Sequence, residues 1–120
     1  MVNIFKLASE FEEKTKGWKL YLDDQIFDKE TPNRWVLEGY IGASSSDEAK
    51  KLVEEKGLPI MIDFDHDLGG DDKATNFLNW LIYWALDRGL TEIPQYKIHS
   101  ANPVGKNNLI SLMESWRKVI

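Results

Sequence analysis

The feature that most constrains the fold is the almost continuous apolar run at 58–64, LPIMIDF. A run of this kind is typical of a parallel strand that is covered on both faces. Further strand-like runs occupy 18–22, 35–41 and 96–100, and helical patterns separate the later ones. Strands that alternate with helices favour an α/β protein. We therefore predict a mostly parallel sheet of about four strands flanked by helices.

Helical apolar spacing recurs in four segments. A leading helix ends at Gly17, and its apolar stripe consists of Ile4, Leu7, Ala8 and Phe11. A second helix starts at Ser45, which has the capping-box spacing with Glu48, and it ends before Gly57. A closing helix begins at about 104–106.

The remaining helical pattern, at 73–88, is apolar over more than one stripe and includes Trp80 and Trp84. Such a surface either packs between the sheet and another helix, such as the leading one, or takes part in a subunit contact. We favour internal packing. The sequence does not indicate an oligomeric state.

The composition fits one folded domain over 1–120, with 42% hydrophobic residues. The chain has no cysteine, which excludes disulfides, thiolate metal sites and a cysteine nucleophile, and fits a cytoplasmic protein. Its start, MVNIFKLASEFEEK, resembles neither a signal peptide nor a membrane span. The net charge of −5 argues against long nucleic acid as the main partner, because an acidic chain lacks the basic stripe that binds phosphate backbones.

Polar side chains follow three of the predicted strands. They are Asp23 and Asp24 after the first, Asp65, His66 and Asp67 after the third, and His99, Ser100 and Asn102 after the fourth. Because sites in open parallel sheets lie at the carboxyl ends of the strands, we expect these groups to converge. Asp63 lies inside its strand, and we assign it a structural role.

Each group also has an ordinary structural interpretation. Asp23 and Asp24 fit a solvated turn after a strand. Asp65 and Asp67 fit caps of the next helix, although the acids at 71–72 are better placed for that role. A single histidine is more often structural than catalytic. The combination at three strand ends is what favours a functional site.

Carboxylates gathered in one place select a hard cation, and Mg²⁺ commonly binds through one or two carboxylates while it keeps waters and substrate phosphate. The candidate ligands of Mg²⁺, or of Mn²⁺, are Asp23, Asp24 and Asp65. Zinc is disfavoured, because the chain places too few His and no Cys near this site. Ser100 can donate to a phosphate oxygen, and the NPVG turn after it leads into a helix N-terminus, which attracts anions.

Three sequence blocks are recognisable together: LYLDD at 20–24, DFDHDLG at 63–69 and IHSANPVGKNNL at 98–109. They resemble the signature blocks of the cyclic-phosphate processing receiver-like family, which occurs in bacteria and phages. The resemblance runs from about Lys19 to the end of the sequence and leaves the leading helix, 1–17, outside. It implies a receiver-like, flavodoxin-like fold whose acidic pocket serves a phosphoester.

The resemblance also implies residue roles. Asp23 and Asp24 correspond to the paired metal-binding acids of a receiver, and Asp65 corresponds to its phosphoryl-accepting aspartate. Ser100 matches the receiver's Ser/Thr after the next strand. The groups that an ordinary receiver lacks are His66, Asp67, His99 and Asn102.

Two departures from these patterns bear on function. Members of the family commonly carry Arg and Pro soon after L-D-D, whereas this chain reads QIFDKETPNRW, with Arg34 as the nearest cation of that kind. In addition, no later strand ends in the receiver's lysine, since Lys97 lies within the fourth strand and Lys106 beyond it. The second departure argues against a phospho-signalling switch.

The resulting hypothesis is a metal-dependent phosphoesterase that acts on a cyclic phosphate, such as a 2′,3′-cyclic nucleotide end or an ADP-ribose cyclic phosphate. The expected partner is a small phosphorylated nucleotide-like ligand or an RNA end. In this hypothesis His66 or His99 acts as acid or base, Asp67 orients a histidine or the water, and the phosphate is contacted by Ser100 and Asn102. The alternatives are a non-catalytic receiver-like signalling or nucleotide-binding module, and an interaction protein that uses its Trp-rich helix.

Overall fold

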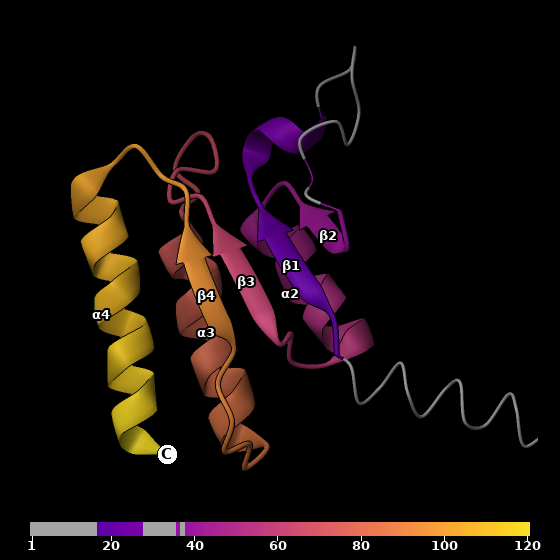
Figure 1. Cartoon of the computed structure of the whole chain (residues 1–120), viewed down its shortest axis with the longest axis vertical. Helices are drawn as coiled ribbons and strands as arrows, with labels where there is room; N and C mark the ends of the chain where they lie inside the picture. Colours follow the sequence, from indigo (N-terminus) through magenta and orange to yellow (C-terminus); the bar gives the residue numbers. More distant parts are fainter. Residues whose placement is uncertain (1–16, 28–35, 37) are drawn as a thin grey trace, which may run out of the picture.

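Four strands form one parallel sheet in the order β2-β1-β3-β4 (Figure 1). The computed structural model describes residues 17–27, 36 and 38–120. The strands are β1 Lys19–Leu22, β2 Tyr40–Ala43, β3 Met61–Phe64 and β4 Gln95–Ile98. The helices are the 3-10 helix η1 Asp24–Phe27 and the α-helices α2 Ser46–Lys56, α3 Ala74–Asp87 and α4 Pro103–Val119. The predicted receiver-like α/β fold is confirmed, while the predicted leading helix lies outside the described residues.

Two strand boundaries differ from their predictions. The strand expected at 35–41 is β2, which begins later because a turn at 38–39 precedes it, with Gly39 at a φ of +82°. The register of β2 with β1 pairs Leu22 with Ala43. Backbone hydrogen bonds to β1, rather than the apolar pattern of the sequence, therefore set the first and last residues of β2. The strand expected at 96–100 is β4, which ends before His99.

The helix termini explain where α2 and α4 begin. The predicted capping box of α2 is confirmed, since the Ser45 hydroxyl accepts a hydrogen bond from the Glu48 backbone N–H at 3.1 Å. The Asn102 side chain caps α4 by accepting from the Gly105 N–H at 3.0 Å, and Pro103 fills the first helical position. None of the described helices is both long and apolar enough to cross a membrane.

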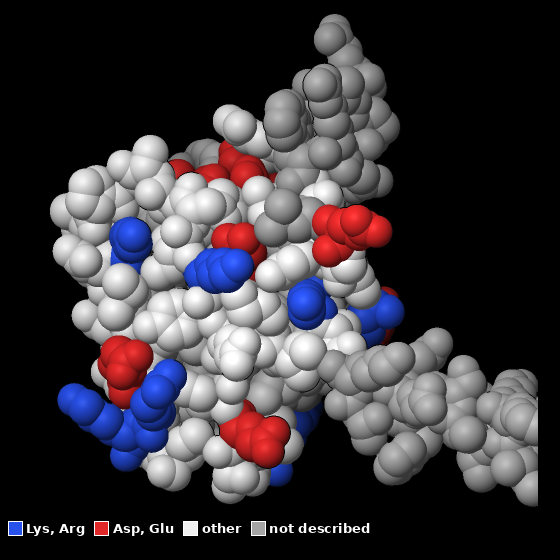
Figure 2. Space-filling view, in the orientation of Figure 1, with Lys and Arg blue, Asp and Glu red and all other residues white. Residues whose placement is uncertain are grey.

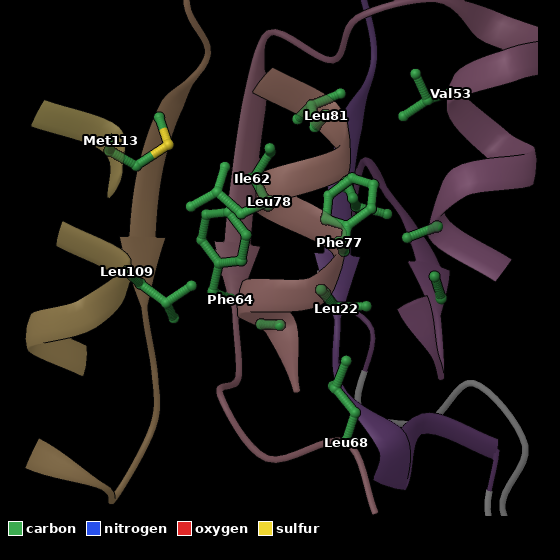
Figure 3. Close-up of a cluster of buried hydrophobic side chains, with 14 of the residues drawn as sticks. Leu22, Val53, Ile62, Phe64, Leu68, Phe77, Leu78, Leu81, Leu109 and Met113 are labelled. Carbon is green, nitrogen blue, oxygen red and sulfur yellow. The ribbon is translucent and has the colours of Figure 1, made fainter. Parts of the chain in front are cut away.

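The three α-helices form one layer on a single face of the sheet, with α3 between α2 and α4 (Figure 1). Alternate strand residues point into this layer and form the core in Figure 3 with side chains of the helices. The fully buried members on α3 are Ala74, Phe77, Leu78, Leu81 and Ala85. The wide apolar surface at 73–88 is therefore packed internally, and its neighbours among the described helices are α2 and α4.

No described helix covers the opposite face of the sheet, which is turned toward the viewer in Figure 1. The sequence predicted cover on both faces of the central strand, and the described helices supply it on one face. Met61 and Asp63 of β3 point to the other face and are still only 8% and 5% exposed. The register places Asp63 between Tyr21 of β1 and Lys97 of β4. A buried carboxylate at this position requires a partner.

Candidate metal and phosphate site

Asp23, Asp65 and His99 each lie one residue beyond the end of a strand. The backbone N–H of each donates to the neighbouring strand, and the accepting carbonyls belong to Ala43, Leu22 and Phe64, at 3.0, 2.8 and 2.8 Å. These bonds continue the parallel ladder by one step and hold the three residues at the same edge of the sheet. The edge includes the ends of β1 and β3, where the strand order of the sheet reverses and where open α/β sheets bind their ligands.

The side chains of these three residues meet in one group. One ligand atom from each of Asp23, Asp65 and His99 lies within 4.8 Å of the other two. The side chains of Asp23 and His99 are 13% and 28% exposed, so the group is partly buried but open to solvent. Two carboxylates and one imidazole are a suitable set for a divalent cation such as Mg²⁺ or Mn²⁺. The predicted ligand Asp24 lies outside this group.

The electrostatics of the cluster favour a bound proton or cation. Burial, and then the charge of Asp23, raises the pKa of the Asp65 carboxyl above its ordinary value, although His99 opposes the shift. Burial, and then the charge of Asp23, also raises the pKa of the Asp24 carboxyl. Folding has thus brought these negative charges close enough to disfavour one another.

His99 is held in place on three sides. Its Nδ1 lies 2.6 Å from Asp63 Oδ1, and its Nε2 lies 3.2 Å from Asp23 Oδ2. Its ring stacks on Tyr21, with the centroids 4.9 Å apart and the planes at 5°. Burial, followed by the charges of the nearby aspartates, raises the pKa of the Tyr21 phenol, so the ring beneath His99 stays neutral. These contacts hold the imidazole with Nδ1 toward Asp63 and Nε2 toward Asp23.

Asp63 is the site residue that the sequence interpretation missed. It was assigned a structural role because it lies within a strand, yet Asp63 and Asp65 are two positions apart and therefore point to the same face. The signal was available, since a carboxylate inside an apolar strand is costly to bury without a partner. The partner is His99, which is 36 residues away in the sequence.

His66, Asp67 and Asn102 form a second network beside the cluster. His66 is 5% exposed, and its Nδ1 lies 3.1 Å from Asp67 Oδ1. The Asn102 amide donates to Asp67 Oδ2 at 3.4 Å and also caps α4. The His66 ring lies against Gly105, where a Cβ atom would collide with it. This network joins the loop after β3 to the start of α4, and within it Asp67 contacts the His66 imidazole.

Ser100 belongs to the turn that leads into α4. Its hydroxyl oxygen accepts from the Asn102 N–H at 3.1 Å, which leaves the hydroxyl proton able to donate to a ligand oxygen. The first turn of α4 also contains Lys106, which is exposed. Lys97 lies on the face without described helices, beside Asp63. Arg34 lies outside the described residues.

The acids at 71–72 do not cap α3 as the structural alternative suggested. α3 begins after Lys73 without a side-chain cap, and Asp72 instead accepts hydrogen bonds from the Ser46 N–H and hydroxyl at 2.9 and 2.6 Å. Burial opposes ionisation of Asp72, but the hydrogen bonds from Ser46, Asn76 and the Lys73 backbone together lower the pKa of the carboxyl. Asp72 therefore fastens the loop after β3 to the start of α2.

Fold and site together define a receiver-like α/β domain with an acidic group at its strand ends. A comparison with protein-family models matches residues 18–115 to the cyclic-phosphate processing receiver domain. The chain belongs to that family. Comparison with curated proteins and with solved structures finds no match.

Proposed function

We propose that this chain is a metal-dependent phosphoesterase that opens a cyclic phosphate. The observation that carries the proposal is the group formed by Asp23, Asp65 and His99, whose ligand atoms lie within 4.8 Å of one another at the strand-order reversal. Membership of a cyclic-phosphate processing family supports the substrate class. The candidate substrates are 2′,3′-cyclic nucleotide ends and ADP-ribose cyclic phosphates.

In this proposal Asp23 and Asp65 would hold the cation, and Asp24, on which the charge of Asp23 acts, would add negative charge beside it. Carboxylate ligands fit both Mg²⁺ and Mn²⁺. A divalent ion at such a site would neutralise charge on the phosphorus oxygens and make a bound water more acidic. The raised pKa values of Asp65 and Asp24 support a cation there, because its charge would relieve the repulsion between the carboxylates.

His99 is the proton donor in this proposal. Ring opening adds one water to phosphorus and breaks one ring P–O bond, and the released sugar oxygen takes up a proton. His99 Nε2 faces Asp23, which would hold the cation, while Asp63 holds Nδ1. His66 is buried against α4, so it suits a positioning role through Asp67 better than proton transfer. We assign the phosphate contacts to Ser100, whose hydroxyl proton is available to a ligand, and to Asn102.

The direct test is turnover of a panel of cyclic phosphates by the full chain with Mg²⁺ or Mn²⁺, followed by phosphorus NMR. We expect ring opening by the wild type and none above background by Asp65→Asn. Asp71→Asn is the matched control, because Asp71 is exposed and lies outside the cluster. Absence of turnover across the panel, with the wild type and Asp65→Asn indistinguishable, would contradict the proposal.

A receiver-like module that accepts a phosphoryl group on Asp65 is the second candidate. The observation in its favour is the place of Asp65, directly after the central strand β3 and beside β1. Acetyl phosphate with intact-mass detection separates the two functions. A phospho-adduct lasting minutes, absent from Asp65→Asn, would support the module and not the phosphoesterase.

A further inference from the structure

A groove of about 990 Å³ extends onto the sheet face that carries no described helix. Its walls are the connection from α2 to β3 and the connection from α3 to β4, and its lining includes the first residue of each strand. The carboxylate cluster lies beyond the other ends of the same strands. Alternate residues of β4 point to this face and lead from the groove to His99. A ligand held at the cluster can therefore continue along the sheet into the groove.

The groove is basic, although the chain as a whole has a net charge of −5. Its lining contains three cations, Lys19, Arg88 and Lys97, against the single acid Glu92. The three cations are exposed, and none of them forms an ion pair with another described residue. Figure 2 shows this face, with basic side chains across its middle and acidic side chains at the upper end of the strands. A local excess of positive charge in an acidic protein favours an anionic ligand.

Aromatic rings accompany two of these cations. The Arg88 guanidinium lies 4.1 Å from the centroid of the Trp84 ring, and the Lys19 ammonium lies 5.6 Å from the centroid of the Tyr40 ring. Both rings line the groove. Surfaces that combine cations with aromatic rings bind single-stranded nucleic acids, because the phosphates meet the charges while the bases stack on the rings or on arginine.

A row of side chains connects the groove with the cluster. Tyr40 meets Tyr21 edge to face with the ring centroids 6.3 Å apart, and Tyr21 stacks on His99. Lys97 lies two residues before His99 on the same face, which corresponds to about 7 Å along the strand. The nucleotide next to a phosphate held at the cluster would therefore reach the groove.

We propose that the groove binds the nucleotides that precede the cyclic phosphate at the 3′ end of a single-stranded RNA. This inference rests on the proposed function, because it places the cyclic phosphate at the carboxylate cluster. Lys19 and Lys97 lie on strands separated by β3, with their backbones about 10 Å apart across the sheet. That separation suits successive phosphates of a nucleotide chain better than the adjacent phosphates of an ADP-ribose. Three cations limit the contact to a few nucleotides, in agreement with the acidic character of the whole chain.

Binding of product-like RNA to the full chain tests this subsite without turnover. The probes are a tetranucleotide with a 3′-phosphate, the corresponding 3′-mononucleotide and ADP-ribose, each titrated in Mg²⁺ and followed by nitrogen-15 NMR. We expect the tetranucleotide to shift the indole signal of Trp84 and the amide signals of Leu90 and Ile93, and the mononucleotide to leave them in place. The tetranucleotide should bind about 10-fold more tightly than the mononucleotide or better, because each stacked base adds affinity.

Two variants test the charge of the groove. Arg88→Gln and Lys19→Gln should each raise the Kd of the tetranucleotide about 3–10-fold, and each should reduce the slope of log K against log salt concentration by about 0.7. Arg117→Gln is the matched control, because Arg117 is exposed on α4 and does not line the groove. It should match the wild type in both measurements.

Three results would overturn the subsite: no binding of the tetranucleotide, affinity equal to that of the mononucleotide, or binding without shifts at the groove. Tighter binding of ADP-ribose with shifts of the same signals would also overturn it, and would assign the groove to a small nucleotide. The titration and the ring-opening assay are independent. Groove binding by the tetranucleotide without ring opening of any cyclic phosphate would contradict the phosphoesterase and support the RNA subsite.

Discussion

Asp63 Oδ1 lies 2.6 Å from His99 Nδ1, and this contact connects a buried strand residue to the open end of the sheet. A carboxylate buried within an apolar strand is stable only when it is paired. Because Asp63 holds Nδ1, Nε2 is directed at Asp23. The Asp65 carboxylate lies in the same group as Asp23 and His99. One buried residue thus sets the orientation of the imidazole that we propose as proton donor.

Asp63→Asn should separate the orientation of the His99 imidazole from the binding of substrate. The amide preserves the shape but weakens the contact that holds Nδ1, so we expect the orientation of the imidazole to loosen and kcat to fall about 10–100-fold while KM changes little. The nitrogen-15 shifts of the His99 ring should also move, and they are simple to assign because His66 is the only other histidine. Asp87→Asn, at the exposed end of α3, is the control. Unchanged kcat and unchanged ring shifts would show that Asp63 does not orient His99.

His99→Gln should separate proton donation from metal ligation. If His99 donates the proton, kcat should fall about 10²–10⁴-fold while the stabilisation by Mn²⁺ is retained, because Asp23 and Asp65 still bind the ion. The measurements are turnover and the thermal shift on adding Mn²⁺. Loss of the Mn²⁺ shift in His99→Gln would instead make the imidazole a metal ligand.

The raised pKa of Asp65 predicts how stability depends on pH without metal. A carboxyl with a raised pKa in the folded state favours folding below its unfolded pKa, and this contribution is lost as pH rises through the folded value. In chelator at neutral pH, Asp65→Asn should therefore melt roughly 2–5 °C above the wild type, a modest effect because solvent screens a partly exposed group.

The difference between the melting temperatures of the two proteins should shrink as pH falls through the raised pKa of folded Asp65, and it should be absent below about 3.9, the ordinary pKa of aspartate. The lowered pKa of Asp72 acts in the opposite sense, but it acts equally in both proteins and cancels in the comparison. Addition of Mn²⁺ should stabilise the wild type more than Asp65→Asn. A variant that is no more stable than the wild type at any pH would refute the proposed repulsion.

Gly105→Ala tests the contact between His66 and α4. Alanine within a helix is normally more favourable than glycine by about 1 kcal/mol. Here the added methyl would collide with the imidazole, so we expect destabilisation by about 1–3 kcal/mol in urea unfolding. In a His66→Ala background the same substitution should be neutral or stabilising. Equal effects in both backgrounds would mean that the ring is not packed on Gly105.

The sequence predicted the sheet and the convergence of its strand ends, because both follow from local patterns. The apolar run before Asp65 indicated a central strand, and the acids after two strands indicated a common edge. It could not predict the limits of β2, because these depend on pairing with Leu22 rather than on the apolar residues from 35 onward.

The roles of individual site residues depended on contacts that no local pattern encodes. Asp63 and His99 are partners through the pairing of β3 with β4, and His66 is buried because α4 begins at Asn102 and lies on it. The sequence places residues 65–67 together after one strand and does not show that their side chains join two different groups. Only the fold separates the carboxylate cluster from the network at the start of α4.

The central claim is that the carboxylate group binds a divalent ion, and anomalous scattering from a crystal of the full chain soaked in Mn²⁺ tests it most directly. The account predicts one peak between Asp23 and Asp65 on the side that faces His99, and its loss in Asp65→Asn crystals. Crystals that show no peak at these residues, with the two carboxylates apart in solvent, would contradict it.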